Sequence, residues 1–145
     1  MATVKLILTQ KGSHVYSVGV EATVLNAALL MNDHQVGALV VLKGSRVKGI
    51  FTERDVLRRV VAKGRDPAAT RIGEVMTSDV ICCRTETSID EARGVFKNQR
   101  IRHLPVVNDQ KQLLGLISIG DLNAYHATAQ EQTINSLEES LYGLA

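Results

Sequence analysis

A hydroxyl and a carboxylate recur twice in this chain at the same spacing, each time after a glycine and two apolar residues. Residues 49–55 read Gly-Ile-Phe-Thr-Glu-Arg-Asp, and residues 115–121 read Gly-Leu-Ile-Ser-Ile-Gly-Asp. Each copy is predicted to stand where a strand ends and a helix begins. The unpaired N–H groups of a helix N-terminus suit a phosphate, and a carboxylate has two acceptor oxygens for the hydroxyls of a ribose. Two such units indicate a paired ligand site rather than a single catalytic centre.

The same residues also have a purely structural explanation. Thr52 followed by Asp55, and Ser118 followed by Asp121, have the spacing of a capping box. In that motif the hydroxyl and the acid satisfy free backbone N–H groups of the first helical turn. Capping does not explain why a glycine precedes each hydroxyl by three residues, so both interpretations are kept.

The motif belongs to a longer internal repeat, which predicts the elements that position it. Residues 24–41 match residues 89–106, and the two motifs match at a shift one residue larger, because the turn at 108–111 holds an insertion. Each half reads strand, helix, strand, strand, helix. The predicted elements of the first half are strand 14–18, helix 24–31 with Thr23 as its N-cap, strands 37–42 and 47–51, and helix 53–63. Those of the second half are strand 80–83, helix 89–98, strands 103–107 and 113–118, and a helix from about residue 119.

Length, charge and composition limit the function classes. At 145 residues the chain fits one domain, and its halves must share a core because neither buries enough surface alone. The net charge is only +2, aromatic residues make up 3% and tryptophan is absent, so nucleic acid is not an expected partner. The sequence shows no metal-ligand set, activated nucleophile or phosphate-binding loop, so we expect no enzymatic activity and no bound metal.

Cysteines and the two ends of the chain bear on location and assembly. Cys82 and Cys83 are neighbours on a predicted strand, which is unsuited to a disulfide and typical of a reducing, cytoplasmic protein.

The apolar stretch at residues 6–8 is too short for a signal peptide or a membrane span. The C-terminal segment predicts an amphipathic helix that covers the body of the protein or a dimer mate, and its acidic polar face does not suit a membrane. Its apolar stripe consists of Leu122, Tyr125, Ala129, Thr133, Leu137 and Leu141.

Five segments together resemble the tandem CBS-domain family, whose paired repeats are also called Bateman modules. They are residues 36–41, 49–55, 73–77, 100–107 and 115–121, and the resemblance extends over about residues 4–126. It implies an α/β (α+β) CBS-pair fold of two βαββα repeats with pseudo-two-fold symmetry and an extended C-terminal helix. The implied units are a first repeat with an N-terminal lead-in (1–66), a second repeat with the linker (67–126) and a C-terminal helical extension (127–145).

The resemblance also implies roles for individual residues. Similar modules regulate IMP dehydrogenase, AMP-activated protein kinase and some transporters and channels by binding adenosine-containing ligands. Ribose binding then falls to Asp55 and Asp121. Phosphate binding falls to Thr52, Ser118, Arg54, Arg100, Arg102 and His103. The adenine pocket falls to Gly37, Ala38, Leu39, Ile50, Phe51, Leu104, Pro105, Val106, Leu116 and Ile117.

The two implied sites are unequal. Basic residues precede the strand only in the second half, whereas the Glu-Arg pair occurs only in the first motif.

The implied function is a regulatory sensor of an adenine nucleotide, with AMP as the first choice and ATP, ADP, NAD(H) or S-adenosylmethionine as alternatives. The family commonly pairs two modules into a flat disc, so a homodimer is expected, together with an effector protein that the sequence does not name. The alternative is a structural dimerisation module without a physiological ligand.

Overall fold

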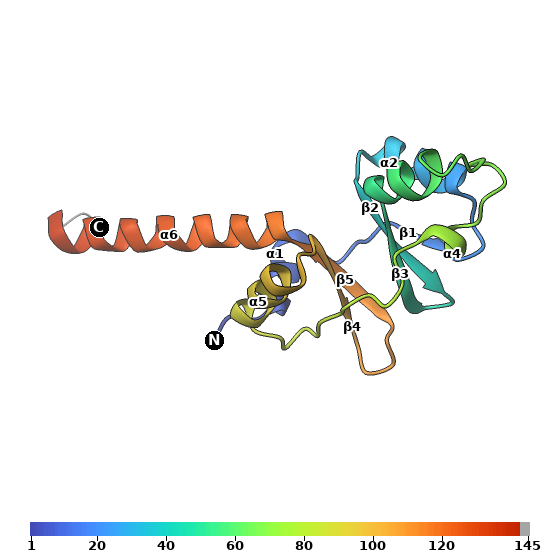
Figure 1. The fold of residues 1–145 in the computed structure, drawn as a ribbon. Helices are drawn as coiled ribbons and strands as arrows, with labels where there is room; N and C mark the ends of the chain where they lie inside the picture. Colours follow the sequence, from blue (N-terminus) through green and yellow to red (C-terminus); the bar gives the residue numbers. More distant parts are fainter. Residues whose placement is uncertain (143–145) are drawn as a thin grey trace.

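Two repeats lie side by side, each with its own small sheet, and a long helix projects from the second repeat (Figure 1). The computed structural model describes residues 1–142, so residues 143–145 of the predicted C-terminal extension lie outside the described residues. The mixed fold of two repeats with an extended C-terminal helix is confirmed. The elements are α1 (Val4–Lys11), β1 (Ser17–Gly19), α2 (Val24–His34), β2 (Ala38–Lys43), β3 (Arg46–Thr52), α3 (Glu53–Asp55), η1 (Val56–Val61), α4 (Ile72–Val75), α5 (Ile89–Gln99), β4 (His103–Val107), β5 (Leu113–Ser118) and α6 (Ile119–Tyr142).

The two sheets show how far the repeat extends. In the first sheet β1 runs parallel to β2, and β2 pairs antiparallel with β3. The second sheet holds only the antiparallel pair β4 and β5. The predicted strand 80–83 is wrong: only Cys83 pairs with the sheet, through a single parallel bridge to Val106. Val80 and Ile81 lie outside the ladder and line a cavity.

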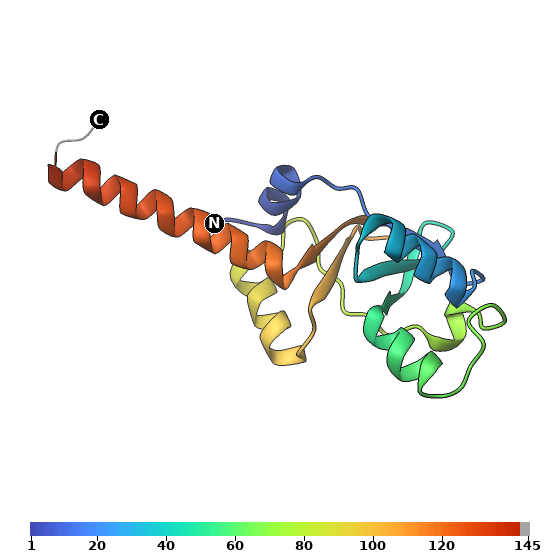
Figure 2. The ribbon, with the colours of Figure 1, turned by 90° about the horizontal axis from the view of Figure 1, so that it is seen from above.

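Local capping chemistry sets where several helices begin. The Thr23 hydroxyl accepts a hydrogen bond from the Asn26 N–H at 3.1 Å, as predicted for the start of α2. Ser88 and Glu91 form a capping box at the start of α5. The predicted helix 53–63 is present as the single turn α3 and the wider π-helix η1. Within the described residues, α6 is continuous to its last residue (Figure 2).

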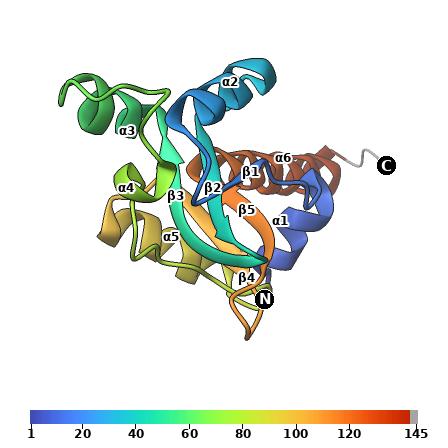
Figure 3. The same cartoon turned by 90° about the vertical axis from the view of Figure 1, so that its right-hand side faces the viewer.

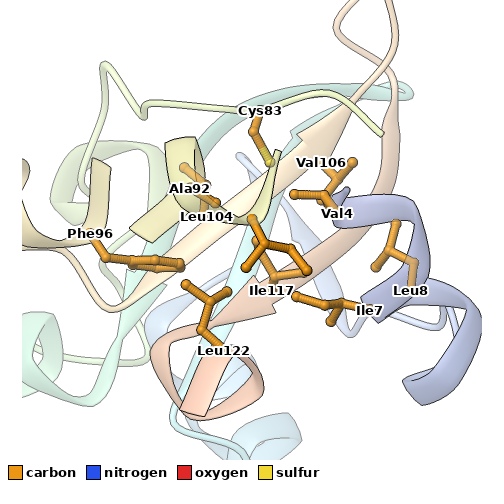
Figure 4. Packing of buried hydrophobic residues seen from close by; sticks show 11 residues of the cluster. Val4, Ile7, Leu8, Cys83, Ala92, Phe96, Leu104, Val106, Ile117 and Leu122 are labelled. Atoms are coloured by element: carbon orange, nitrogen blue, oxygen red, sulfur yellow. The ribbon is translucent and has the colours of Figure 1, made fainter. Parts of the chain in front are cut away.

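Helix α1 was not predicted, and it packs on the second repeat rather than on the first. Val4, Ile7 and Leu8 are buried against Leu104 and Ile117 of the β4–β5 hairpin (Figure 4). This core also holds Cys83, Ile89, Ala92, Phe96, Val106 and Leu122. The short apolar stretch at residues 6–8 is therefore part of helix α1, whose buried face completes the core of the second repeat.

Helix α4 makes the reciprocal contact. Ile72 and Val75 are buried in the core of the first repeat, although they lie just before the second repeat in the chain. An antiparallel bridge fixes each incoming segment to a helix start: Thr3 to Ser88, and Arg71 to Thr23. The lead-in segment of each repeat thus completes the core of the other.

A third apolar cluster joins the two repeats. Val40 and Val47 of the first sheet are buried against Val107 of the second, with Leu42 and Leu116 packed around them. Figure 3 shows the strands of both repeats meeting at the centre of the molecule, with helices around them. The shared core expected from the size of the halves is therefore present. Among the described residues, no helix has both the length and the apolar character required to cross a membrane.

Candidate functional site

A cavity of about 570 Å³ lies between the two repeats, a size typical of small-molecule sites. The first motif lines one side, and the turn from α5 into β4 lines the other side. The segment after α4 lies between them. The lining residues are Gly37, Ile50, Thr52, Glu53, Arg54, Asp55, Arg58, Arg59, Thr77, Asp79, Val80, Ile81, Gln99, Arg100, Ile101, Arg102 and His103.

Asp55 both caps the helix and faces this cavity. Its N–H donates to the Thr52 hydroxyl at 3.3 Å, and its Oδ2 accepts from the Thr52 N–H at 3.0 Å, which completes the capping box. The Thr77 hydroxyl lies 3.3 Å from Oδ1, and Arg59 Nε lies 3.4 Å from the same oxygen. These last two contacts are long, so the carboxylate keeps acceptor capacity for the hydroxyls of a ligand.

Asp121 has the same cap but a different neighbour. The Ser118 N–H donates to Asp121 Oδ2 at 2.8 Å, and the Asp121 N–H donates to Ser118 Oγ at 3.1 Å. Lys11 Nζ lies 2.7 Å from the same Oδ2 and donates to the Leu116 carbonyl oxygen at 2.9 Å. Neither Ser118 nor Asp121 lines the cavity. The structure therefore brings only the first motif to the cavity.

The motif glycines are explained by the exchanged lead-in segments. A Cβ placed on Gly49 would lie 2.6 Å from the Thr77 carbonyl oxygen and 2.8 Å from Met76 Sδ. A Cβ placed on Gly115 would lie 2.7 Å from a terminal carbon of Leu8. Each glycine therefore lets the segment that enters the opposite repeat pass close to the strand.

The cavity carries an excess of positive charge. Five arginines line it, against Glu53, Asp55 and Asp79. Arg54, Arg100 and Arg102 were predicted here, whereas Arg58 and Arg59 belong to a helix face that the sequence gives no reason to treat as more than solvated surface. Helix η1 turns this face to the cavity, where the combined charge favours an anionic group such as phosphate.

The CBS domain model matches residues 11–62 and 72–127, one copy for each repeat. The chain belongs to the CBS-domain family. It is a CBS pair, which is a regulatory module.

Individual relatives agree with this assignment. The chain is 41% identical over 105 residues to the mitochondrial CBS domain-containing protein CBSX3 of Arabidopsis thaliana, a match that covers 69% of this chain and spans about half (50%) of that protein. A crystal structure of a CBS-domain containing protein from Agrobacterium tumefaciens is 33% identical, with a TM-score of 0.78, over 86% of this chain and 99% of that one. The CBS domain pair of protein MJ0100, solved with 5′-methylthioadenosine and S-adenosyl-L-methionine, is 21% identical but shares the fold, with a TM-score of 0.79 over 89% and 98% of the two chains.

His103 lies at the edge of the CBS-pair cleft. Burial lowers the pKa of its imidazole, and the charges of Lys11 and Arg102 lower it further, while Asp121 opposes them. The ring is therefore neutral near pH 7 in the free protein. A phosphate placed beside it would favour the protonated form.

The predicted adenine pocket divides into two groups. Gly37 and Ile50 line the cavity. The side chains of Leu39, Phe51, Leu104, Val106 and Ile117 are fully buried in the cores of the CBS repeats, as is Pro105. Ala38 is buried and Leu116 packs at the junction between repeats. The residues of this second group do not line the cavity, and their direct contact with a base stays a prediction.

The cysteines of the CBS pair are free and lie in different apolar clusters. Cys83 belongs to the core of the second repeat, and Cys82 to the cluster between repeats. Burial raises the pKa of the Cys83 thiol to about 12, and burial also raises that of Cys82. Both thiols are therefore protonated near pH 7 and weakly nucleophilic.

Proposed function

We propose that the cleft between the repeats binds an adenine nucleotide as a regulatory ligand. One observation carries this proposal. Asp55, whose carboxylate keeps acceptor capacity, and five arginines line the same cavity of about 570 Å³. Asp55 would accept hydrogen bonds from the ribose hydroxyls, with the Thr52 hydroxyl directed to phosphate. Arg54, Arg100 and Arg102 would bind the phosphate oxygens. The adenosyl ligands named for the MJ0100 structure support the ligand class.

Ligand binding would act by shifting the balance between conformations of the module or its assembly. The ligand bridges two repeats joined by one short linker, so it favours the closed arrangement of the cleft. An effector protein would then read that arrangement. The reduced thiols support a reducing compartment, and we propose the cytoplasm.

The charge of the cleft predicts the order of ligand preference. Isothermal titration calorimetry with AMP, ADP, ATP, NAD(H) and S-adenosylmethionine should show binding of the phosphate-bearing ligands. S-Adenosylmethionine carries a positive sulfonium centre and no phosphate, so we expect it to bind at least about tenfold more weakly than AMP. A folded protein that binds none of these ligands would refute the proposed function.

The lowered pKa of His103 leads us to expect that AMP binding depends on pH. Its pKa is lowered in the free protein, and a bound phosphate would raise it, so binding takes up a proton. AMP affinity should therefore rise as the pH falls from 8 towards 6, by up to about tenfold for each unit by which binding raises the pKa. Calorimetry across this range measures the effect. The His103→Gln variant, which titrates only through the phosphate itself, should show a flatter profile, and an unchanged slope would contradict the role of His103.

A second candidate function is homodimerisation, favoured by two exposed apolar faces. Helices α2 and η1 expose Leu29, Leu57 and Val61 by 52%, 61% and 62%. Helix α6 exposes Ile134, Leu137 and Leu141 at steps of three and four residues. Glu131 and Glu138 border the α6 stripe, and Lys63 and Arg65 follow η1 at the other face, all four exposed. We propose that α6 of one copy packs on α2 and η1 of a second copy, with matched charges at the edges.

The proposed pairing is tested by single substitutions on both faces. Leu137→Glu and Leu57→Glu should each convert the dimer to a monomer in sedimentation and native mass spectrometry, because each places a charge in an apolar contact. Glu138→Lys alone should weaken the dimer, and adding Lys63→Glu should restore part of the loss. A Leu137→Glu variant that remains fully dimeric would exclude α6 from the interface.

A further inference from the structure

The Lys11 side chain contacts the second motif at Asp121, the carboxylate that the family resemblance assigns to ribose binding. Its Nζ lies 2.7 Å from Asp121 Oδ2 and donates to the Leu116 carbonyl oxygen at 2.9 Å. The carboxylate oxygen that accepts from Lys11 is the one that already accepts from the Ser118 N–H at 2.8 Å. Asp121 Oδ2 and the Leu116 carbonyl oxygen are therefore already engaged by the Lys11 ammonium.

The first motif has no equivalent cation from a lead-in segment. Ile50, which corresponds to Leu116 in the repeat, exchanges backbone hydrogen bonds with Thr77 at 3.0 Å and 2.9 Å. Apart from the cap contacts with Thr52, Asp55 meets long contacts from Thr77 and Arg59, and it lines the cavity. The same exchange of lead-in segments thus leaves one motif available and covers the other with a lysine.

We propose that Lys11 acts as a latch that keeps the second CBS site closed, so that the chain binds one adenine nucleotide in the first site. This inference rests on the proposed function of the cleft and adds a rule for its stoichiometry. The latch is confined to one side chain. Val4 and Ile7 anchor α1 in the core with 0% and 3% exposure, whereas Lys11 ends the helix and its side chain is 36% exposed.

The contact is weak enough to be opened. Partly exposed ion pairs and single hydrogen bonds each contribute modestly to stability, so removing the ammonium should strengthen ligand binding at the second site by about tenfold. His103 lies near both Asp121 and Lys11 and also lines the first cavity. His103 thus connects the Lys11–Asp121 ion pair to the lining of the cavity.

Calorimetry with AMP on the full chain tests the latch. The variants are Lys11→Met, which removes the cation, Lys11→Arg, which keeps it, and Lys5→Met, a control on an exposed lysine of the same helix. We expect one tight binding event in the wild type, in Lys11→Arg and in Lys5→Met, with any binding at the second site about tenfold weaker than in Lys11→Met, where two events should be resolved. Adding Asp55→Asn to Lys11→Met should remove the first event and leave the second.

Each other outcome has one meaning. If the wild type binds one AMP and Lys11→Met still binds one, the latch is wrong and the proposed function stands. If Lys11→Met weakens binding, or if the wild type already binds two equivalent AMP molecules, Lys11 is a ligand contact or a bystander and the latch is again wrong. If only Lys11→Met binds, the latch holds and the proposed role of the first site fails. If no variant binds AMP, both proposals fail.

Discussion

The Asp55→Asn variant should bind AMP about 100-fold more weakly than the wild type, which corresponds to about 2.7 kcal/mol. The substitution keeps the size of the side chain, and the amide oxygen of asparagine can still accept the hydrogen bond from the Thr52 N–H that completes the capping box. It removes the charge and one acceptor, and hydrogen bonds to a charged group contribute about 1.5–3 kcal/mol each. Calorimetry gives the affinity, and thermal unfolding of the free variant checks that the fold is kept.

Asp121→Asn is the matched control for this prediction. Asp121 occupies the same place in the second motif and makes the same cap, but it does not line the cavity. Binding of AMP to the first site should change by less than about twofold, because Asp121 does not line the cavity and acts on its lining only through its charge near His103. Equal losses of AMP affinity in the two variants would show that both aspartates act only as helix caps, and that Asp55 has no separate role in ligand binding.

The Gly49→Ala variant should be less stable than the wild type by about 2 kcal/mol or more. The added methyl would meet the Thr77 carbonyl oxygen at 2.6 Å, and a backbone atom held in a bridge to Ile50 cannot move aside easily. Forcing extra carbon into a packed region costs about 1–3 kcal/mol. Gly115→Ala should cost less, because its methyl meets the flexible end of the Leu8 side chain. Urea unfolding measures the free-energy differences.

Gly94→Ala provides the opposite expectation. Gly94 lies in the middle of α5, and a Cβ there meets nothing within 4 Å. Alanine at this helical position should stabilise the protein by about 0.5–1 kcal/mol. If Gly49→Ala and Gly94→Ala changed stability alike, the close approach of the lead-in segment would not be the reason for the motif glycine.

Much of the fold follows from local signals in the chain. The elements β4 and β5 have their predicted bounds, and Thr23 caps α2 as predicted, because apolar runs and capping residues act over a few positions. Helix α1 was missed because its buried residues, Val4, Ile7 and Leu8, become a recognisable face only against the second repeat. The predicted strand 80–83 is wrong because an apolar run does not show whether a partner strand is available, and only Cys83 pairs with the sheet.

In the candidate site too, some residues are predicted from the sequence and others are recognised only in the tertiary structure. Asp55 is predicted from motif spacing and the basic run before β4 from the resemblance to the CBS family, and the fold brings them to one cavity. No sequence pattern assigns Arg58 and Arg59 to the site, because only the orientation of η1 shows that they line the cavity. Lys11 lies 110 residues from Asp121, and no local pattern connects them. Contacts that decide which motif is available thus depend on the tertiary exchange of the lead-in segments.

That exchange also has a consequence for how the molecule is made and taken apart. The first repeat lacks part of its interior until α4 is in place, and the second requires α1, which is synthesised first. The bridges from Thr3 to Ser88 and from Arg71 to Thr23 close long loops, which slows folding and ties the halves into one cooperative unit. The duplicated sequence therefore does not behave as two independent folding units, and loss of either repeat removes a structural part of the other.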